Sequence, residues 1–171
     1  MATRPANELL LGEWACLAII YAHPQHGFAV AAKLKPDSEI GRVWTMSRAL
    51  TYRAIDQLAE RGLIEPICEE QGIAGGNRTV YKCTRKGSAA VRNWLRRPVE
   101  HVRDIRSELL LKLLLGNESD VESADLVTAQ AEVVRTQFEQ MRAELELAPD
   151  NVVLRWRVES ADAALRFLNQ L

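Results

Sequence analysis

The residues best suited to bind another molecule lie on one predicted helix, in the stretch TMSRALTYRAIDQLAERGLIE at residues 45–65. One side of this helix is mostly apolar at three- and four-residue spacing, through Ser47, Thr51, Ala54, Ile55 and Leu58. Tyr52 and Arg53 lie on its other sides and can reach outward. A phenol hydroxyl can hydrogen-bond a phosphate, and a guanidinium can bind a phosphate or the edge of a guanine. An exposed face with these groups indicates nucleic-acid binding.

The same stretch predicts how the helix ends. Arg61 and Gly62 place a cation in the last turn and then a residue that readily adopts the left-handed conformation. Two segments of strand composition follow, over residues 64–70 and 79–83, joined by a glycine-rich connection with Arg78 at its base. A helix that runs directly into a β-hairpin is typical of a winged helix-turn-helix. An ordinary amphipathic helix before a glycine-rich surface turn is the alternative.

Shorter predicted elements surround this helix. Three further helices are expected over residues 8–22, 28–34 and 85–97. Pro24 ends the first of them and Thr84 caps the last. Residues 25–27 are expected to form a turn, and residues 37–43 a polar loop.

The C-terminal part predicts helices that bury large apolar surfaces. Residues 104–115 are apolar on several faces, and Gly116-Asn117 is expected to end this helix. Residues 125–148 keep a coiled-coil-like 4-3 alternation. After a break at 149–151, one face of a last helix carries Val153, Trp156, Ser160, Ala164, Phe167 and Leu171. Two helices joined by a short break predict an antiparallel hairpin.

The fold class expected is therefore mainly α with a small β-hairpin wing. A winged helix-turn-helix DNA-binding domain at 1–98 would precede a helical, coiled-coil-like dimerisation domain at 99–171. The expected dimerisation residues are Leu109, Leu113, Val127, Ala131, Val134, Phe138, Met141, Leu145, Trp156 and Phe167. A three-helix bundle that closes on itself within one chain is the alternative.

Charge is divided unevenly between the two parts. Residues 1–100 carry 14 Lys+Arg and 10 Asp+Glu, a net charge of +4, whereas residues 101–171 carry 8 and 13, a net charge of −5. A basic part that can face phosphates, joined to an acidic part that cannot, favours a DNA-binding domain on a separate assembly domain.

Other kinds of site find little support. The three histidines (His23, His26, His101) are dispersed without metal-ligand spacing, so no metal or other cofactor is expected. No nucleophile motif or catalytic carboxylate pair appears, which argues against an enzyme. Cys68 and Cys83 lie on the two predicted strands, where they could face each other as a redox pair or as small buried hydrophobes.

Localisation follows from similar evidence. The three cysteines are an odd number without a CxxC motif, which suits a reducing cytoplasm. No membrane span is expected, because no run of about 18 apolar residues lacks charge. Glu8 and Glu13 interrupt the apolar N-terminal stretch, so no signal peptide is expected either.

Three segments resemble the PadR family of bacterial transcriptional regulators: HGFAVAAKL at 26–34, SRALTYRAIDQLAERGLIE at 47–65 and RTVYKCTRKGSAAV at 78–91. Family members carry a HGY-like turn, a Y-x-x-L-x-x-L-x-x-x-G-L recognition helix and a Y-x-L-T-x-x-G wing exit. This chain departs from those patterns at Phe28, Ala49, Thr51, Ile55 and Cys83. The resemblance covers residues 9–97. Residues 104–171 are similar, through looser motifs, to the helical dimerisation region of longer PadR-like proteins.

The resemblance implies a homodimeric repressor that binds operator DNA in the cytoplasm and associates with the nucleoid through that DNA. The expected contacts to double-stranded DNA come from Ser47, Arg48, Ala49, Tyr52, Arg53, Asn77, Arg78, Lys82, Arg85 and Lys86. Whether Arg53 reads a guanine or clamps a phosphate stays open. Some PadR-like regulators bind flat aromatic effectors between tryptophans at the dimer centre, which makes Trp94 and Trp156 the candidate effector site. The alternative is a winged-helix module that docks a protein partner instead of DNA.

Overall fold

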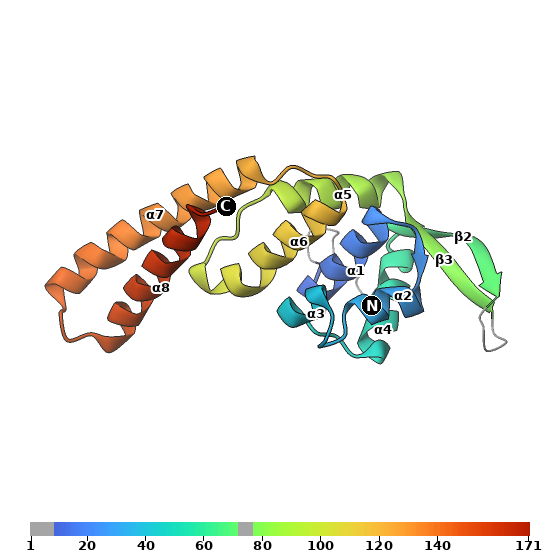
Figure 1. The fold of residues 1–171 in the computed structure, drawn as a ribbon, viewed down its shortest axis with the longest axis horizontal. Coiled ribbons are helices and arrows are strands. Elements are labelled where there is room, and N and C mark those ends of the chain that lie inside the picture. Colours follow the sequence, from blue (N-terminus) through green and yellow to red (C-terminus); the bar gives the residue numbers. More distant parts are fainter. Residues whose placement is uncertain (1–8, 72–76) are drawn as a thin grey trace. The chain divides into compact units, whose positions relative to one another are not determined.

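The computed structural model describes residues 9–71 and 77–171, which form two compact units (Figure 1). The first unit comprises the chain up to Leu95 together with Leu110–Val121, and the second comprises Arg96–Leu109 and Glu122–Leu171. The predicted glycine-rich wing tip at 72–76 lies outside the described residues.

The first unit is a winged helix-turn-helix, which confirms the predicted fold class. Its elements are α1 (Leu11–Ala22), β1 (Gln25–His26), α2 (Gly27–Lys33), α3 (Glu39–Val43), α4 (Arg48–Glu60), β2 (Ile64–Gln71), β3 (Asn77–Cys83), α5 (Arg85–Arg96) and α6 (Leu110–Glu118). The three strands form an antiparallel sheet in the order β1-β3-β2. β2 and β3 project together beyond the helices as the wing (Figure 1).

The core of this unit surrounds α1. Residues 15–20 of α1 are all fully or almost fully buried, and α1 packs against α4, α6 and β3. The predicted stripe on α4 is confirmed, because Thr51, Ala54, Ile55 and Leu58 are its buried residues. Gly62 follows with φ +67°, in the left-handed region that the predicted helix end requires.

The prediction of a polar loop at 37–43 is wrong, because α3 forms there. The Ser38 hydroxyl accepts a hydrogen bond from Gly41 N at 3.0 Å and caps this short helix, which buries Ile40. Gly41 is required because a Cβ at this position would overlap the carbonyl oxygen of Lys35. A helix of five residues is too short to be stable alone, so the cap and the packing of Ile40 stabilise it more than helix propensity does.

The predicted turn at 25–27 is also different in the structure. Gln25 and His26 pair with Tyr81 and Val80 of β3 as a third strand. His26 then caps α2, since its Nδ1 accepts a hydrogen bond from Ala29 N at 3.1 Å. A strand of two residues depends on the wing strand beside it, so local sequence alone does not indicate it.

The apolar segment predicted as one helix at 104–115 is three elements. A 3₁₀ turn (Val102–Asp104) and a π-helical turn (Ile105–Leu109) precede α6, and α6 continues past Gly116 to Glu118. Leu111 and Leu115 belong to the core that surrounds α1. Residues 110–121 therefore pack with the winged helix, whereas the predicted boundary assigned all of 99–171 to the second domain.

The second unit contains the predicted antiparallel helical hairpin, α7 (Ala124–Leu147) and α8 (Val152–Leu168) (Figure 1). The Asn151 side chain accepts from Leu154 N at 3.0 Å and caps α8. The buried residues of α8 are Leu154, Val158, Ala161, Ala164 and Leu168, and only Ala164 of these belongs to the apolar face noted in the sequence. Val153 and Trp156 are 65% and 72% exposed.

A buried amide holds the start of this unit on α7. Gln130 is fully buried; its Oε1 accepts from Val99 N at 2.7 Å, and its Nε2 donates to Val99 O at 3.1 Å. Further along α7, Gln137 donates to Glu100 O at 2.6 Å. Two glutamines thus bind the backbone at residues 99–100 as a neighbouring strand would.

Candidate nucleic-acid interface

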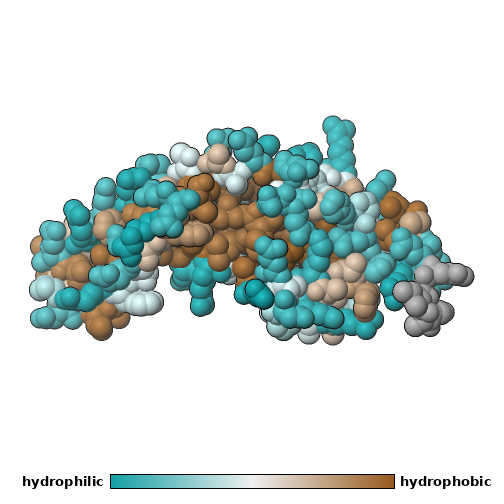
Figure 2. Space-filling model, viewed as in Figure 1, coloured by the Kyte–Doolittle hydropathy of each residue, from teal (hydrophilic) through white to brown (hydrophobic). Residues whose placement is uncertain are grey.

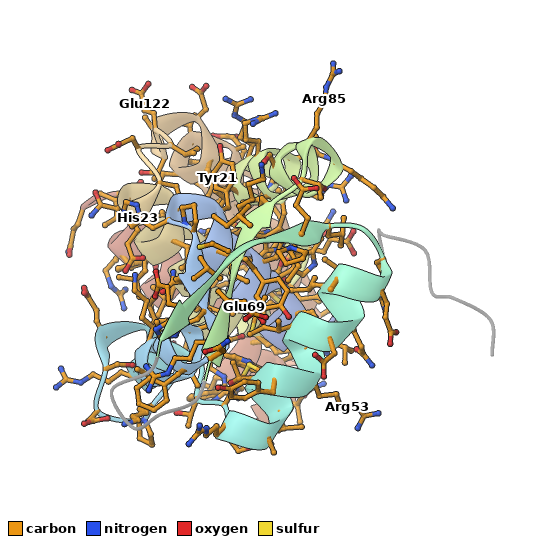
Figure 3. The ribbon with its side chains drawn as sticks, turned by 90° about the vertical axis from the view of Figure 1, so that its right-hand side faces the viewer. Tyr21, His23, Arg53, Glu69, Arg85 and Glu122 are labelled. Carbon is orange, nitrogen blue, oxygen red and sulfur yellow. The ribbon has the colours of Figure 1, made fainter. Side chains whose placement is uncertain are left out.

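The N-terminal half of α4 presents polar side chains to solvent. Ser47 accepts from Leu50 N at 3.3 Å and caps the helix. The exposed residues that follow are Arg48, Ala49, Leu50, Tyr52 and Arg53. Arg53 points away from the body of the unit (Figure 3). The exposed Leu50 was not among the predicted contacts, and its position at this end of the helix is the signal that could have included it.

Four side chains from three elements meet beside this end of α4, and we call them the arginine–aromatic cluster: Phe28, Arg48, Tyr52 and Arg78. The Arg78 guanidinium lies 4.9 Å from the centroid of the Phe28 ring. The Arg48 guanidinium lies 5.3 Å from the Phe28 centroid and 5.6 Å from that of Tyr52. The cluster therefore links α2, α4 and the wing strand β3.

Glycine at position 27 makes room for the cluster. A Cβ at Gly27 would lie 2.9 Å from Tyr52 Cε1, closer than real Cβ contacts, so the Tyr52 ring packs directly on the backbone of α2. Phe28, the next residue, was noted in the sequence only as a departure from a family motif. Its contacts with two arginines are a feature that sequence reasoning missed.

The wing carries acidic groups as well as Arg78. Asn77 donates to a carboxylate oxygen of Glu69 at 2.7 Å, so part of its hydrogen-bonding capacity is used within the hairpin. Glu70 is the register partner of Arg78 on the adjacent strand. The labelled Glu69 lies on the wing in Figure 3. The predicted contacts of Asn77 would have to compete with this carboxylate.

Three of the predicted contacts lie apart from the cluster. Lys82 pairs with Glu65 at 3.2 Å near the base of the wing. Lys86 donates to Arg61 O at 2.9 Å, at the C-terminal end of α4, about 20 Å along the helix from Arg48. Arg85 and Arg53 point toward opposite ends of the unit (Figure 3). The structure thus brings together Arg48, Tyr52 and Arg78, but not the lysines and Arg85.

Comparison with known proteins identifies the family. Residues 16–93 match the sequence model of the family described as "Transcriptional regulator PadR-like family". Residues 16–93 therefore form a PadR-like domain. The matched family consists of transcriptional regulators and not of enzymes, as predicted for this chain.

Solved structures of PadR-like proteins are similar along almost the whole chain. Bacillus subtilis PadR in complex with operator DNA is 19% identical, with 92% of this chain and 96% of that chain covered and a TM-score of 0.48. The same protein with p-coumaric acid is 17% identical, with coverages of 94% and 96% and a TM-score of 0.46. A PadR-like regulator from Bacillus cereus is 19% identical, with coverages of 98% and 97% and a TM-score of 0.44. No curated protein matches the chain.

The structure gives a physical reason for the PadR-like wing exit. Thr84 Oγ1 donates to Gly62 O at 2.8 Å and accepts from Gly87 N at 3.1 Å, so one hydroxyl joins the end of α4 to the start of α5. A Cβ at Gly87 would overlap the carbonyl oxygen of Leu63. The T-x-x-G spacing therefore lets α5 lie directly on the backbone where β2 begins.

The cysteines of this PadR-like chain do not form the predicted pair. Cys68 is opposite Val80 and Cys83 is opposite Ile64, so the two cysteines lie at different points along the hairpin. Cys68 is exposed, whereas Cys83 lies with its sulfur 3.6 Å from Leu17 O. Burial raises the pKa of the Cys83 thiol to about 12, which keeps it protonated at neutral pH. The hypothesis that these cysteines face each other is wrong.

The two candidate effector tryptophans differ in exposure. Trp94 is buried, and its ring stacks on Trp14 with centroids 5.3 Å apart and planes 2° from parallel. Trp156 belongs to the second unit and is exposed. Trp14, which the sequence indicated as a core residue, thus covers one face of Trp94.

The predicted dimerisation residues divide into two groups. Those already buried within the chain are Leu109, Ala131, Val134 and Met141. Those that keep at least partial exposure are Leu113, Val127, Phe138, Leu145, Trp156 and Phe167. Only the second group offers surface to another molecule.

Two further findings concern the described residues alone, 9–71 and 77–171. Within them no group of three or more His, Cys, Asp or Glu could hold a metal ion. In the same ranges, no helix is both long enough and apolar enough to cross a membrane.

Proposed function

We propose that this regulator binds operator DNA with the N-terminal half of α4 in the major groove and Arg78 on the backbone. The arginine–aromatic cluster carries this proposal, together with the exposed Arg53 on the same half of α4. The cluster places the guanidiniums of Arg48 and Arg78 within 5.3 Å of the Phe28 ring centroid. Within the described part of the chain, the side chains of Arg48, Arg53 and Arg78 make no ion pair or hydrogen bond, so their donors are available for phosphates and bases.

The charge along α4 favours entry by its N-terminal half. Asp56 and Glu60 are exposed further along the helix, where a carboxylate facing a phosphate would be repelled. Arg48 and Arg53 lie on the first two turns. Helix-turn-helix proteins commonly contact bases with the first residues of the recognition helix.

We further propose that the regulator is a homodimeric repressor that works in the cytoplasm and associates with the nucleoid through DNA. Large apolar side chains remain exposed around α8, at Leu147, Val152, Val153, Trp156 and Leu171. Figure 2 shows apolar groups at the end of the second unit where α7 meets α8. A second copy would cover this surface with its own equivalent, as in an isologous interface.

The competing function is a winged-helix module that docks a protein partner, which the acidic Asp56 and Glu60 would suit. A mobility shift with the DNA upstream of its own coding sequence, repeated over a range of salt, separates the two. Operator binding predicts an affinity that falls linearly with salt on logarithmic axes, with a slope of about 0.9 for each phosphate neutralised. Salt-independent or absent binding to every genomic fragment would favour the protein partner.

Arg53→Ala is expected to weaken operator binding by about 1–3 kcal/mol for each half-site if the guanidinium is bidentate to guanine. Discrimination at one base position should then relax, whereas a phosphate clamp would lose affinity equally on all sequences. Folding should be unaffected, because Arg53 is exposed and alanine is also a good helix former.

Arg85→Ala is the matched control for this change, since it removes an exposed arginine that points away from Arg53 (Figure 3). Its operator affinity should equal that of the parent. If Arg53→Ala also binds operator and random DNA as tightly as the parent, α4 does not enter the groove.

Release by a small aromatic effector completes the proposal. The exposed Trp156 ring would stack on such a molecule at the dimer interface, while Trp94 already stacks on Trp14. p-Coumaric acid, the ligand in the Bacillus subtilis PadR structure, is a suitable first probe. Titration should quench the tryptophan fluorescence of the parent but not of Trp156→Phe to the same extent, and it should release the operator. An operator complex unaffected by a panel of phenolic acids would contradict effector control.

A further inference from the structure

Phe28 is an aromatic side chain outside the buried core of the first unit. It lies on the second position of α2 and is 39% exposed. Part of the side chain is therefore accessible, and its ring can be contacted by residues of other elements. His26, the capping residue of the same helix, lies 6.2 Å from it, ring centroid to ring centroid.

The two guanidiniums over this ring come from elements that are far apart in sequence. Arg48 begins α4 and Arg78 lies on the wing strand β3. Glu70 is directly opposite Arg78 in the sheet, where an ion pair would be expected. Within the described residues no such ion pair forms, and the Arg78 guanidinium lies 4.9 Å from the Phe28 centroid instead.

Stacking holds an arginine without using its hydrogen bonds. A guanidinium contacts an aromatic ring through its flat face, while its five N–H donors point outward in its own plane. Arg48 and Arg78 can therefore keep their positions on Phe28 and still bind phosphate oxygens. Arginines held in this way lose less side-chain entropy when they bind than free ones would.

We infer that Phe28 is a positioning residue for DNA binding: it fixes Arg48 of the recognition helix and Arg78 of the wing in one arrangement, ready to contact neighbouring phosphates. This inference rests on the proposed function. It adds a residue from α2, outside both the recognition helix and the wing, and it assigns that residue no contact with DNA of its own. Phe28 joins two surfaces that would otherwise bind independently.

The test compares Phe28→Leu, which keeps apolar volume but removes the ring, with Phe28→Tyr, which keeps the ring. Phe28→Leu should weaken DNA binding by roughly 5- to 150-fold for each winged-helix unit, because two arginine side chains would then have to be ordered on binding. Phe28→Tyr should bind as the parent does. The melting temperature of Phe28→Leu should stay within a few degrees of the parent, since the residue is partly exposed.

A second arm separates positioning from direct contact. In a background of Arg48→Ala with Arg78→Ala, Phe28→Leu should have no further effect, because the residue acts only through those arginines. A loss that persists there would overturn the inference and assign Phe28 a contact of its own. Equal affinity of Phe28→Leu and the parent would overturn it as well.

The arrangement can also be observed without DNA. The Nε–Hε resonances of Arg48 and Arg78 should carry a ring-current shift that disappears in Phe28→Leu and persists in Phe28→Tyr. Resonances that do not move in Phe28→Leu would show that the cluster does not form. A parent that binds no DNA would refute the proposed function alone, because these resonances report the arrangement independently.

Discussion

Gly87→Ala is expected to lower the free energy of unfolding of the first unit by about 3 kcal/mol, the upper end of the usual cost of overpacking. The added methyl group would overlap the carbonyl oxygen of Leu63, and a backbone atom cannot rotate away as a side chain can. To remove this overlap α5 would have to shift, and the shift would disturb the hydrogen bonds of Thr84 Oγ1 with Gly87 N and Gly62 O. In urea unfolding, with a slope of 1–3 kcal/mol per M, the midpoint should fall by about 1–3 M.

Gly116→Ala is the matched control. Gly116 lies inside α6, and the nearest atom to a Cβ there, Val121 O, is 3.4 Å away. Alanine should be tolerated and should stabilise the helix by up to about 1 kcal/mol, since glycine is the poorer helix former. Equal midpoints for the two variants would mean that α5 does not press on Leu63 as the structure shows.

Trp156→Glu is expected to convert the proposed dimer into a monomer. The tryptophan is 72% exposed within one chain, so a glutamate costs the protomer little. In an isologous interface the charge would be buried once for each copy, and an unpaired buried charge is costly. Sedimentation velocity at micromolar concentration should show a dimer for the parent and a monomer for the variant. Operator affinity should fall too, because two linked winged helices bind more tightly than one.

Asp162→Asn is the control for this change, because it alters charge on α8 away from the exposed apolar residues. Asp162 lies six residues after Trp156, about 120° around the helix from it. This variant should remain a dimer. If Trp156→Glu sediments as the parent does, the second copy docks elsewhere; a monomeric parent would end the dimer proposal.

Sequence periodicity predicted the elements whose pattern is long enough to be distinctive. The α4 stripe and its end at Gly62 are confirmed, as are the wing strands and the Thr84 cap. These features depend on interactions within a few residues, which a local pattern can reveal. The family match over residues 16–93 accords with this, since it covers the same elements.

Features that depend on distant partners were not predicted. β1 exists because β3 lies beside it, and α3 has only five residues, too few for a periodic pattern. On α8, apolar residues occupy two faces, so spacing alone could not tell that Leu154 and Val158 contact α7 while Val153 and Trp156 face outward. The contacts of Phe28 are with Arg48 of α4 and Arg78 of the wing, both distant in sequence, so local pattern could not indicate them.

The pairing of Gln130 with Val99 constrains how this protein can be recombined. The oxygen and the nitrogen of the buried Gln130 amide bond the N–H and the carbonyl of Val99, so residue 99 must stay in register with α7. An amide left buried without that partner would cost about 1–3 kcal/mol. An insertion or deletion at residues 99–100 would therefore break the hydrogen bonds to α7 and destabilise the second unit. A chimaera that replaces the winged helix should join the chains before Val99, so that this segment travels with α7, and should also replace residues 110–121, which pack with the winged helix.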